Sequence, residues 1–374
     1  MSDLTGKKWR RVVIKVGTST LTAGTPRLNP PRMVDLARQI CSVVQAGTGT
    51  VLVTSGAQQA GREHLSHPVE RRNIPYSQML AAVGQSRLMS LWEHYFDLYG
   101  LTVAQVLLTR EDIEDRQRYL NVRDTFEALL QRGIVPVVNE NDAVATDEIK
   151  VGENDSLAAM VANAIEADLL VLLTDIDGLY TADPSRDPNA RFMDRVPVID
   201  DAIYKIATGS SRSGMGSGGM YTKIVAADLA VHSGTTVAIA NGSHEQVISG
   251  VLDGTVRATW FPARISPSEG RRRWLLAHAV TSGSVYIDDG ACRALTEEGR
   301  SLLAVGVTST EGTFARGEIV SVRNHAGREI ARGLVNYDAA DVARIQGHHS
   351  VDLVDTLGYD YGPEVIHRNN LALI

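Results

Sequence analysis

The sequence predicts an α/β protein with a mainly parallel sheet between helix layers, followed by a small, mainly β domain. Through about the first 260 residues, short runs of Val, Ile and Leu alternate with longer amphipathic segments. Continuous apolar runs separated by helices are typical of parallel strands that are covered on both faces. After residue 274, short alternating segments with turn residues between them replace this pattern, which favours a separate β domain.

The predicted elements follow from these patterns in chain order. The expected strands are 11–16, 50–55, 102–109, 134–138, 169–174 and 236–240. The expected helices are 30–46, 77–99, 119–132, 154–166 and 218–233. Ligands of such sheets bind at the carboxyl ends of the strands, so we expect functional residues directly after each apolar run.

The domain boundaries are predicted from a change of composition. A length of 374 residues suggests two or three domains. Residues 264–274 are rich in Pro, Ser and Arg and are predicted to be a linker. The first domain is therefore expected at 1–263 and the second at 275–374, with a helical patch around 338–346.

Composition excludes several classes of protein. The formal net charge of −7 argues against a protein that coats nucleic acid. The two cysteines, Cys41 and Cys292, are far apart, which fits a reducing compartment. The N-terminal segment does not resemble a signal peptide, and no apolar stretch approaches the roughly 20 residues of a membrane span. We therefore expect a cytoplasmic protein with no membrane partner.

Two strand ends carry candidate ligand-binding residues. In "VVIKVGTST", Lys15 interrupts an apolar strand that ends at Gly17. A buried Lys is costly unless it is ion-paired or bound to an anion, and the glycine allows a ligand to approach the backbone. An ion-paired or surface-directed lysine is the alternative. In "VTSGAQQAG", Ser55 and Gly56 suit a carboxylate or phosphate, although an ordinary strand-to-helix turn fits as well.

Residues 138–163 are dense in amide and acid groups. The polar cluster comprises Asn139, Asn141, Asp142, Asn154 and Asp155. Helix capping explains one such residue but not five, so the cluster favours a polar ligand with an amino group. Further along, Thr174 and Asp175 end the strand in "LLTDIDGLYTADP", where a nucleotide ribose or base could bind; turn formation is the alternative.

The glycine-rich run "SGMGSGGMYTK" (213–223) leads into a predicted helix with Lys223 in its first turn. Free backbone N–H groups and the helix dipole favour an anion there. The run contains G-x-G-x-x-G but lacks the preceding strand and the later acid of a dinucleotide fingerprint. A surface linker is the alternative. The lysine favours a phosphate site.

These features together indicate a type of reaction. Two lysines and a glycine loop without a general base suit phosphoryl transfer to an acceptor that is already anionic, such as a carboxylate. Catalysis then consists of positioning and of neutralising the transferring group with Lys and Mg²⁺. His348 and His349 have no obvious partners, and we favour a structural role over a metal site for them.

Six motifs in order resemble the glutamate 5-kinase family: "IKVGTS", "VTSGA", "NENDAVAT", "KVGENDSLAA", "LLTDIDGLYTADP" and "SGGMYTK". "YDAADVARIQG" and "LGYDYGPEVIHRNNL" are similar to its PUA domain. The resemblance implies an amino-acid-kinase fold. It also implies ATP-dependent phosphorylation of the γ-carboxylate of L-glutamate to L-glutamyl 5-phosphate, the first step of proline biosynthesis.

The resemblance also implies roles for individual residues. The catalytic residues would be Lys15, Lys223 and Asp155, with Asp155 orienting the two lysines. The ATP site would comprise Lys15, Thr174, Asp175, Ser217, Gly218, Gly219, Met220, Tyr221, Thr222 and Lys223. The L-glutamate site would comprise Ser55, Asp142 and Asn154. No residue is expected to be a dedicated metal ligand, because Mg²⁺ would be bound mainly through the ATP phosphates.

The family further implies a homo-oligomer, dimeric or tetrameric, and feedback inhibition by L-proline. The sequence departs from the expected pattern at Gln58, where we expect a small or aliphatic residue, and this affects substrate affinity and feedback sensitivity rather than the chemistry.

Two other functions are alternatives to phosphorylation of glutamate. An RNA-binding role is suggested by the PUA resemblance, but residues 275–360 contain 7 Arg, no Lys and 12 Asp or Glu, whereas an RNA-binding face should be basic. The other alternative is a sister kinase acting on N-acetylglutamate or aspartate. The additional domain and "NENDAVAT" favour glutamate.

Overall fold

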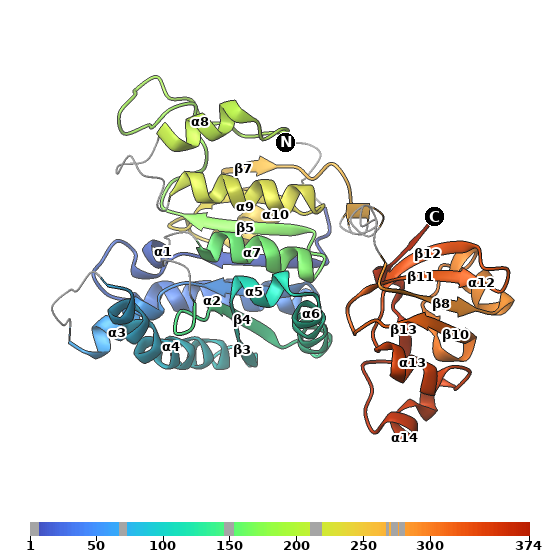
Figure 1. Ribbon diagram of the computed structural model, residues 1–374. Coiled ribbons are helices and arrows are strands. Elements are labelled where there is room, and N and C mark those ends of the chain that lie inside the picture. Colours follow the sequence, from blue (N-terminus) through green and yellow to red (C-terminus); the bar gives the residue numbers. More distant parts are fainter. Residues whose placement is uncertain are drawn as a thin grey trace. The chain divides into compact units, whose positions relative to one another are not determined.

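The computed structural model describes residues 7–66, 73–145, 153–209, 219–266, 269–270, 276 and 281–374 (Figure 1). The chain forms two compact units. Unit 1 comprises Met1–Ile113 and Arg123–Pro267, and unit 2 comprises Glu114–Val122 and Ser268–Ile374. The predicted boundaries at 263 and 275 stay predictions, because most of the predicted linker lies outside the described residues.

Unit 1 is built around a seven-stranded sheet in the order β3-β4-β2-β1-β5-β6-β7. The strands are β1 (Arg11–Val16), β2 (Gly49–Thr54), β3 (Val103–Leu108), β4 (Val135–Glu140), β5 (Leu169–Thr174), β6 (Thr236–Asn241) and β7 (Ala258–Phe261). The first six pair in parallel and β7 is antiparallel to β6. The predicted mainly parallel sheet is confirmed. The sequence missed only β7, whose four residues are too short for a pattern.

The helices between residues 7 and 266 vary in length. They are α1 (Thr18–Thr22), α2 (Pro30–Gln45), α3 (Ala57–His64), α4 (Ile74–Asp97), α5 (Arg110–Glu114), α6 (Arg116–Gln131), α7 (Glu153–Ala164), α8 (Asp201–Gly209), α9 (Met220–His232) and α10 (Val247–Asp253). The five predicted helices are present, with ends shifted by a few residues. The sequence did not predict α1, α3, α5 or α10, and the pattern at α8 indicates no more than a helical turn, because five to nine residues are too few for helical periodicity to show.

The sheet lies between two helix layers. Helices α2 and α10 pack together and cover one face with α4, while α7 and α9 pack together on the other face (Figure 1). Successive side chains of a strand point to opposite faces. On β1, Val12, Ile14 and Val16 join the core beneath α2 and α4, so Lys15 points toward α7.

Unit 2 is mainly β. Its five-stranded sheet has the order β10-β8-β11-β12-β14, and β13 pairs with β9 in a second, two-stranded sheet. The strands are β8 (Gly283–Ile287), β9 (Leu302–Leu303), β10 (Val307–Gly312), β11 (Ile319–Asn324), β12 (Glu329–Leu334), β13 (Glu364–Ile366) and β14 (Leu371–Leu373). Its helices include α12 (Asp289–Thr296), α13 (Ala339–Ile345), which confirms the predicted helical patch, and α14 (Leu353–Leu357).

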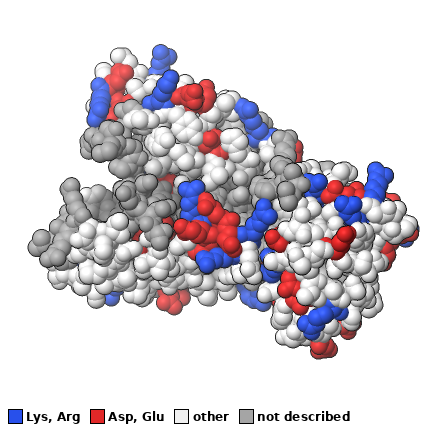
Figure 2. Space-filling model, viewed as in Figure 1, with Lys and Arg blue, Asp and Glu red and all other residues white. Residues whose placement is uncertain are grey.

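The visible face of unit 2 is mixed in charge. Basic and acidic side chains are scattered over it and form no continuous basic surface (Figure 2). No helix among the described residues is long and apolar enough to cross a membrane.

Helices α3 and α4 touch at two glycines. A Cβ built on Gly84 would lie 1.8 Å from the carbonyl oxygen of Ala57, and one on Gly61 would lie 2.0 Å from that of Leu80. Neither contact is possible for a real side chain, so both positions require glycine. This close backbone contact sets where α3 lies, and α3 begins directly after β2.

We predict that Gly84→Ala destabilises the protein, because the added methyl group would push α3 away from α4. Overpacking of a close contact costs about 1–3 kcal/mol, and the free energy of unfolding in urea measures it. Ser86→Ala, at an exposed position on the same helix, is the control and should change it by less than about 0.5 kcal/mol. Equal stability of Gly84→Ala and the wild type would contradict the packing described above.

Candidate active site

The carboxyl ends of β4, β2, β1 and β5 meet at one edge of the sheet, where a pocket of about 640 Å³ opens. The predicted site residues that line it are Lys15, Ser55, Asp142, Asn154, Asp155, Thr174, Asp175, Gly219, Thr222 and Lys223. Residues from six separate stretches of sequence therefore converge on one cavity. Such convergence of polar groups is typical of a small-molecule site.

Asp155 lies between two lysines at the base of this pocket. Its Oδ1 is 2.8 Å from the Nζ of Lys15, and its Oδ2 is 3.2 Å from the Nζ of Lys223. The Thr222 hydroxyl donates a further hydrogen bond of 2.8 Å to Oδ2. The Asp155 side chain is only 1% exposed, and those of Lys15 and Lys223 are 7% and 10% exposed. These three side chains form a buried cluster of two ammonium groups around one carboxylate.

Three elements bring these side chains together. Lys15 points from β1 toward α7, and Asp155 is the third residue of α7. Helix α9 packs against α7 and carries Lys223 in its first turn. The apolar faces of α7 and α9 thus fix the separation of the three charged groups.

Burial and charge act against each other on these groups. Burial lowers the pKa of Lys15, and the nearby Lys223 lowers it further, while Asp155 acts in the opposite direction. Burial alone would raise the pKa of Asp155, but the charges of Lys15 and Lys223 and the hydrogen bonds from Lys15 and Thr222 outweigh it, so this pKa is lowered. Asp155 is therefore firmly ionised at neutral pH.

The pocket provides room and N–H donors beside the lysines. A Cβ at Gly17 would lie 3.4 Å from the Nζ of Lys15, so a side chain there would fill space next to the ammonium group. Helices α1, α3 and α9 begin directly after Gly17, Gly56 and Gly219, and no side chain in the described part of the chain caps any of the three. All three glycines line the pocket. The uncapped N-termini suit an anionic ligand.

A chain of amide groups lies on the β2 and β4 side of Lys15. The Asn154 Nδ2 donates to the Ser55 Oγ and the Asn139 Oδ1, both at 3.1 Å, and the Asn139 Nδ2 donates to the Gln85 Oε1 at 2.8 Å. The Asn154 Oδ1 is buried and accepts no hydrogen bond within the described part of the chain. A buried acceptor of this kind favours a ligand that donates to it.

The β5 side of the pocket is held by the loops after β5 and β6. Thr174 Oγ1 donates to Asp175 Oδ1 at 3.1 Å. Two residues further on, the Asp177 Oδ1 accepts from the Asn241 Nδ2 at 3.2 Å and lies 3.0 Å from the His244 Nε2.

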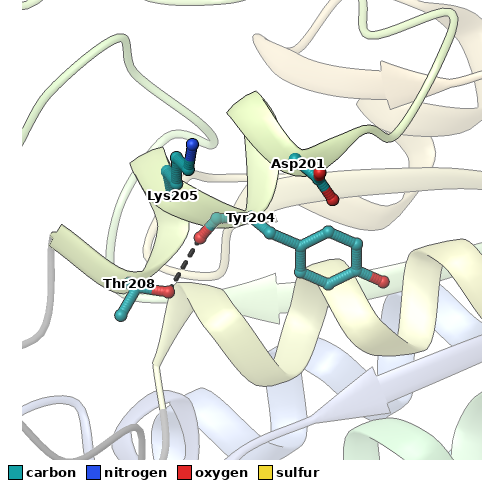
Figure 3. Close-up of a pocket in the computed structure, with 4 residues that line it drawn as sticks. All are labelled: Asp201, Tyr204, Lys205 and Thr208. Carbon is teal, nitrogen blue, oxygen red and sulfur yellow. Dashed lines mark hydrogen bonds between the residues drawn. The ribbon is translucent and has the colours of Figure 1, made fainter.

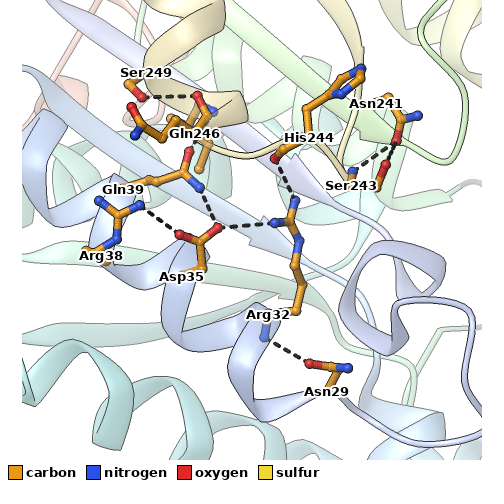
Figure 4. A network of polar contacts seen from close by, with 11 residues as sticks. Asn29, Arg32, Asp35, Arg38, Gln39, Asn241, Ser243, His244, Gln246 and Ser249 are labelled. Carbon is orange, nitrogen blue, oxygen red and sulfur yellow. Dashed lines mark hydrogen bonds and ion pairs between the residues drawn. The ribbon is translucent and has the colours of Figure 1, made fainter. Parts of the chain in front are cut away.

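The loop after β6 is in turn anchored to α2. Arg32 donates to the His244 carbonyl oxygen at 3.4 Å, and the Gln39 side chain accepts from the Ile248 N–H at 2.8 Å (Figure 4). Arg32 also pairs with Asp35 at 3.1 Å, on the same helix. This network fixes the strand end that carries Thr174 and Asp175.

Some predicted residues lie elsewhere. Met220 is buried, the Tyr221 ring lies 6.0 Å from that of Tyr204, and neither lines the pocket. Ser217 and Gly218 lie outside the described residues. The predicted contacts of these four residues with a nucleotide stay predictions.

Helix α3 carries pocket residues that the sequence did not predict. Gln59 and Arg62 line the pocket together with Gln58, which was noted only as a departure from the expected pattern. Their spacing would have placed Gln58 and Arg62 on one helical face if 57–64 had been predicted as a helix.

A second, shallower pocket of about 550 Å³ lies along α8 (Figure 3). Its described lining residues are Asp201, Tyr204, Lys205 and Thr208, all from this helix, and the Thr208 hydroxyl donates to the Tyr204 carbonyl oxygen at 2.8 Å. Because groups from several elements do not converge there, it is the weaker candidate.

Comparison with known proteins identifies the family of this chain. The amino acid kinase family model matches residues 10–241, and the PUA domain model matches residues 283–357. A glutamate 5-kinase of Vibrio vulnificus (strain YJ016) is 51% identical over 98% of this chain and 96% of that relative. A glutamate 5-kinase of Shewanella halifaxensis (strain HAW-EB4) is 47% identical over 100% of both chains.

Among solved structures, the crystal structure of UMP kinase from Ureaplasma parvum covers 68% of this chain and 100% of that chain, with 14% identity and a TM-score of 0.48. The family models and the nearly full-length relatives place the chain in the glutamate 5-kinase family, a branch of the amino acid kinases that carries a PUA domain.

Proposed function

We propose that this protein transfers the γ-phosphoryl group of ATP to the γ-carboxylate of L-glutamate, forming L-glutamyl 5-phosphate and ADP. This reaction would be the first step of proline biosynthesis. The buried Lys15–Asp155–Lys223 cluster carries the proposal, because it places two ammonium groups at the base of a pocket large enough for two ligands. Membership of the glutamate 5-kinase family supports the choice of acceptor.

The pocket offers two different sides for the two substrates. Lys15 lies on β1, between β2 on one side and β5 on the other. The Ser55, Asn139 and Asn154 groups on the β2 and β4 side suit the amino acid. Thr174, Asp175 and the start of α9 on the β5 side suit ATP. The transferring phosphoryl group would then lie between them, next to the lysines.

The chemistry requires no general base. A γ-carboxyl group with a pKa near 4.3 is already ionised at neutral pH and can attack phosphorus directly. The barrier is the repulsion between this carboxylate and the charged phosphates, together with the charge that develops on the leaving group. Lys15 and Lys223 neutralise that charge from fixed positions, since Asp155 holds both ammonium groups while their remaining N–H donors are available to phosphate oxygens.

The donor set fits a Mg²⁺ ion that arrives with ATP. Among the described residues, no group of three or more His, Cys, Asp or Glu could hold a metal ion. Mg²⁺ in such a pocket would take its ligands mainly from phosphate oxygens and water. When bound, it would supply further positive charge to the phosphates.

Three further proposals rest on family resemblance alone. We propose that the enzyme is cytoplasmic, that it assembles as a homodimer or homotetramer, and that L-proline inhibits it by feedback.

The experiment that tests the main proposal is an ATPase assay coupled to ADP release with L-glutamate, N-acetylglutamate and aspartate. Turnover that depends on N-acetylglutamate or aspartate rather than L-glutamate would contradict it.

We predict that Lys15→Ala and Lys223→Ala each lower kcat by about 10²–10³-fold and change the KM for glutamate much less. The reason is that the lysines act on charge that develops during transfer, and removing a preorganised contact of this kind costs that much in rate. Steady-state kinetics with L-glutamate and ATP measure the effect. Near-wild-type kcat in both variants would rule out their proposed role.

We predict that Asp142→Asn raises the KM for L-glutamate by tens-fold or more and leaves the KM for ATP unchanged. Asp142 lines the pocket, and its charge would bind the α-ammonium group of glutamate, which N-acetylglutamate lacks. The preference for glutamate over N-acetylglutamate should therefore narrow. Asp175→Asn is the matched comparison and should affect the KM for ATP instead. If Asp142→Asn weakens ATP and spares glutamate, our placement of the two substrates is wrong.

We predict that Asp155→Asn destabilises the fold by about 3–5 kcal/mol at pH 7, because it leaves two buried ammonium groups without their counter-charge. The loss should shrink as the pH rises toward about 10. Without Asp155, the folded pKa of Lys15 falls further below its unfolded value of about 10.4, so the unfolded chain binds more protons and stability rises with pH.

Urea unfolding at pH 6 to 9.5 tests this pH dependence. Glu298→Gln, which breaks an exposed ion pair with Arg300, is the control and should cost less than about 1 kcal/mol at every pH. A loss for Asp155→Asn that stays constant across this range would show that Lys15 does not titrate as described.

A further inference from the structure

The pocket contains a third cation that the proposed reaction does not use. Among the described residues that line it, Arg62 is the only basic side chain besides Lys15 and Lys223. It belongs to α3, which begins beside Ser55, whereas the two lysines lie on β1 and α9. Arg62 therefore brings positive charge to the pocket from the amino-acid side.

The orientation of α3 is fixed from two directions. The Gln59 Nε2 donates to the Pro26 carbonyl oxygen at 2.6 Å, and Glu63 accepts from the Leu28 N–H at 2.5 Å. These contacts hold one row of the helix against residues 26–28. The glycine contact of α3 with α4 fixes its position on another side.

Gln58 and Arg62 form the neighbouring row, four residues apart, and both line the pocket. The Arg62 side chain is half-buried. A guanidinium has five N–H donors in a planar fork that matches a carboxylate, so contacts with protein neighbours leave donors for a ligand. Arg62 is thus presented to the pocket by a helix that cannot rotate freely.

The proposed acceptor has three charged groups. Its γ-carboxylate reacts beside the lysines, and we assign its α-ammonium to Asp142. Its α-carboxylate remains and needs a cation on the same side of the pocket as Ser55 and Asn154. We propose that Arg62 binds this α-carboxylate and thereby selects acceptors with a free α-carboxyl group. This inference rests on the proposed function.

The test compares two acceptors that differ only in that group. L-Isoglutamine carries an α-carboxamide but keeps the α-ammonium and the γ-carboxylate of L-glutamate. Arg62→Met should raise the KM for L-glutamate about 10–100-fold, the usual size of a lost charged contact, while kcat changes little. The affinity for L-isoglutamine, measured as KM or as a competitive Ki against glutamate, should change less than about twofold. Arg62→Lys should recover part of the loss for glutamate.

Two controls separate this role from others. Arg10→Met removes the same charge from an exposed side chain that pairs with Asp168 and does not line the pocket, and it should leave both affinities unchanged. The KM for ATP should stay constant in every variant.

The proposal is overturned by any of three results. Equal losses for glutamate and isoglutamine in Arg62→Met would mean that Arg62 only shapes the pocket. An unchanged glutamate KM would mean that it does not contact the substrate. Equal affinity of the wild type for both acceptors would mean that the α-carboxylate is not recognised. Failure of the proposed function itself is distinct, since the wild type would then show no glutamate-dependent turnover.

Discussion

One carboxylate shared by two buried ammonium groups is the interaction on which the site depends. Burying Lys15 and Lys223 without compensation would cost several kcal/mol each, and Asp155 offsets much of that cost. Because one negative charge faces two positive ones, the cluster keeps an excess of positive charge. In the proposed reaction, the same arrangement that allows the lysines to be buried would attract a polyphosphate and hold the N–H donors in place during transfer.

The strand order places different groups on the two sides of this cluster. With β1 between β2 and β5, the residues that follow these strands lie on opposite sides of Lys15. The amide chain through Asn154 occupies one side, and the braced loops after β5 and β6 occupy the other. In the proposed reaction, the two substrates would approach Lys15 from these opposite sides, as an in-line phosphoryl transfer requires.

Helix α3 combines a close packing contact with residues that we propose to recognise the substrate. The contact of Gly61 and Gly84 that packs α3 against α4 also sets the position of Gln58 and Arg62 in the pocket. Recognition residues on a rigidly packed helix are placed more accurately than residues on a free loop. Gln58, the one local departure from the expected motif, lies on this same face and also lines the pocket.

The sequence alone determined the parallel sheet, its long helices and the residues after each strand, because apolar periodicity and the placement of glycine and lysine are local patterns. Local patterns did not assign roles within the dense polar segment, and only the resemblance to the glutamate 5-kinase family implied them. Asn154 and Asp155 are neighbours in the chain, yet α7 directs one toward Ser55 and the other toward the lysines. The strand order depends on packing between distant segments. So do the position of Lys223 near Lys15, more than 200 residues earlier in the chain, and the presence of Arg62 on a short helix. Local propensity carries no information about such contacts, so only the tertiary structure decided them.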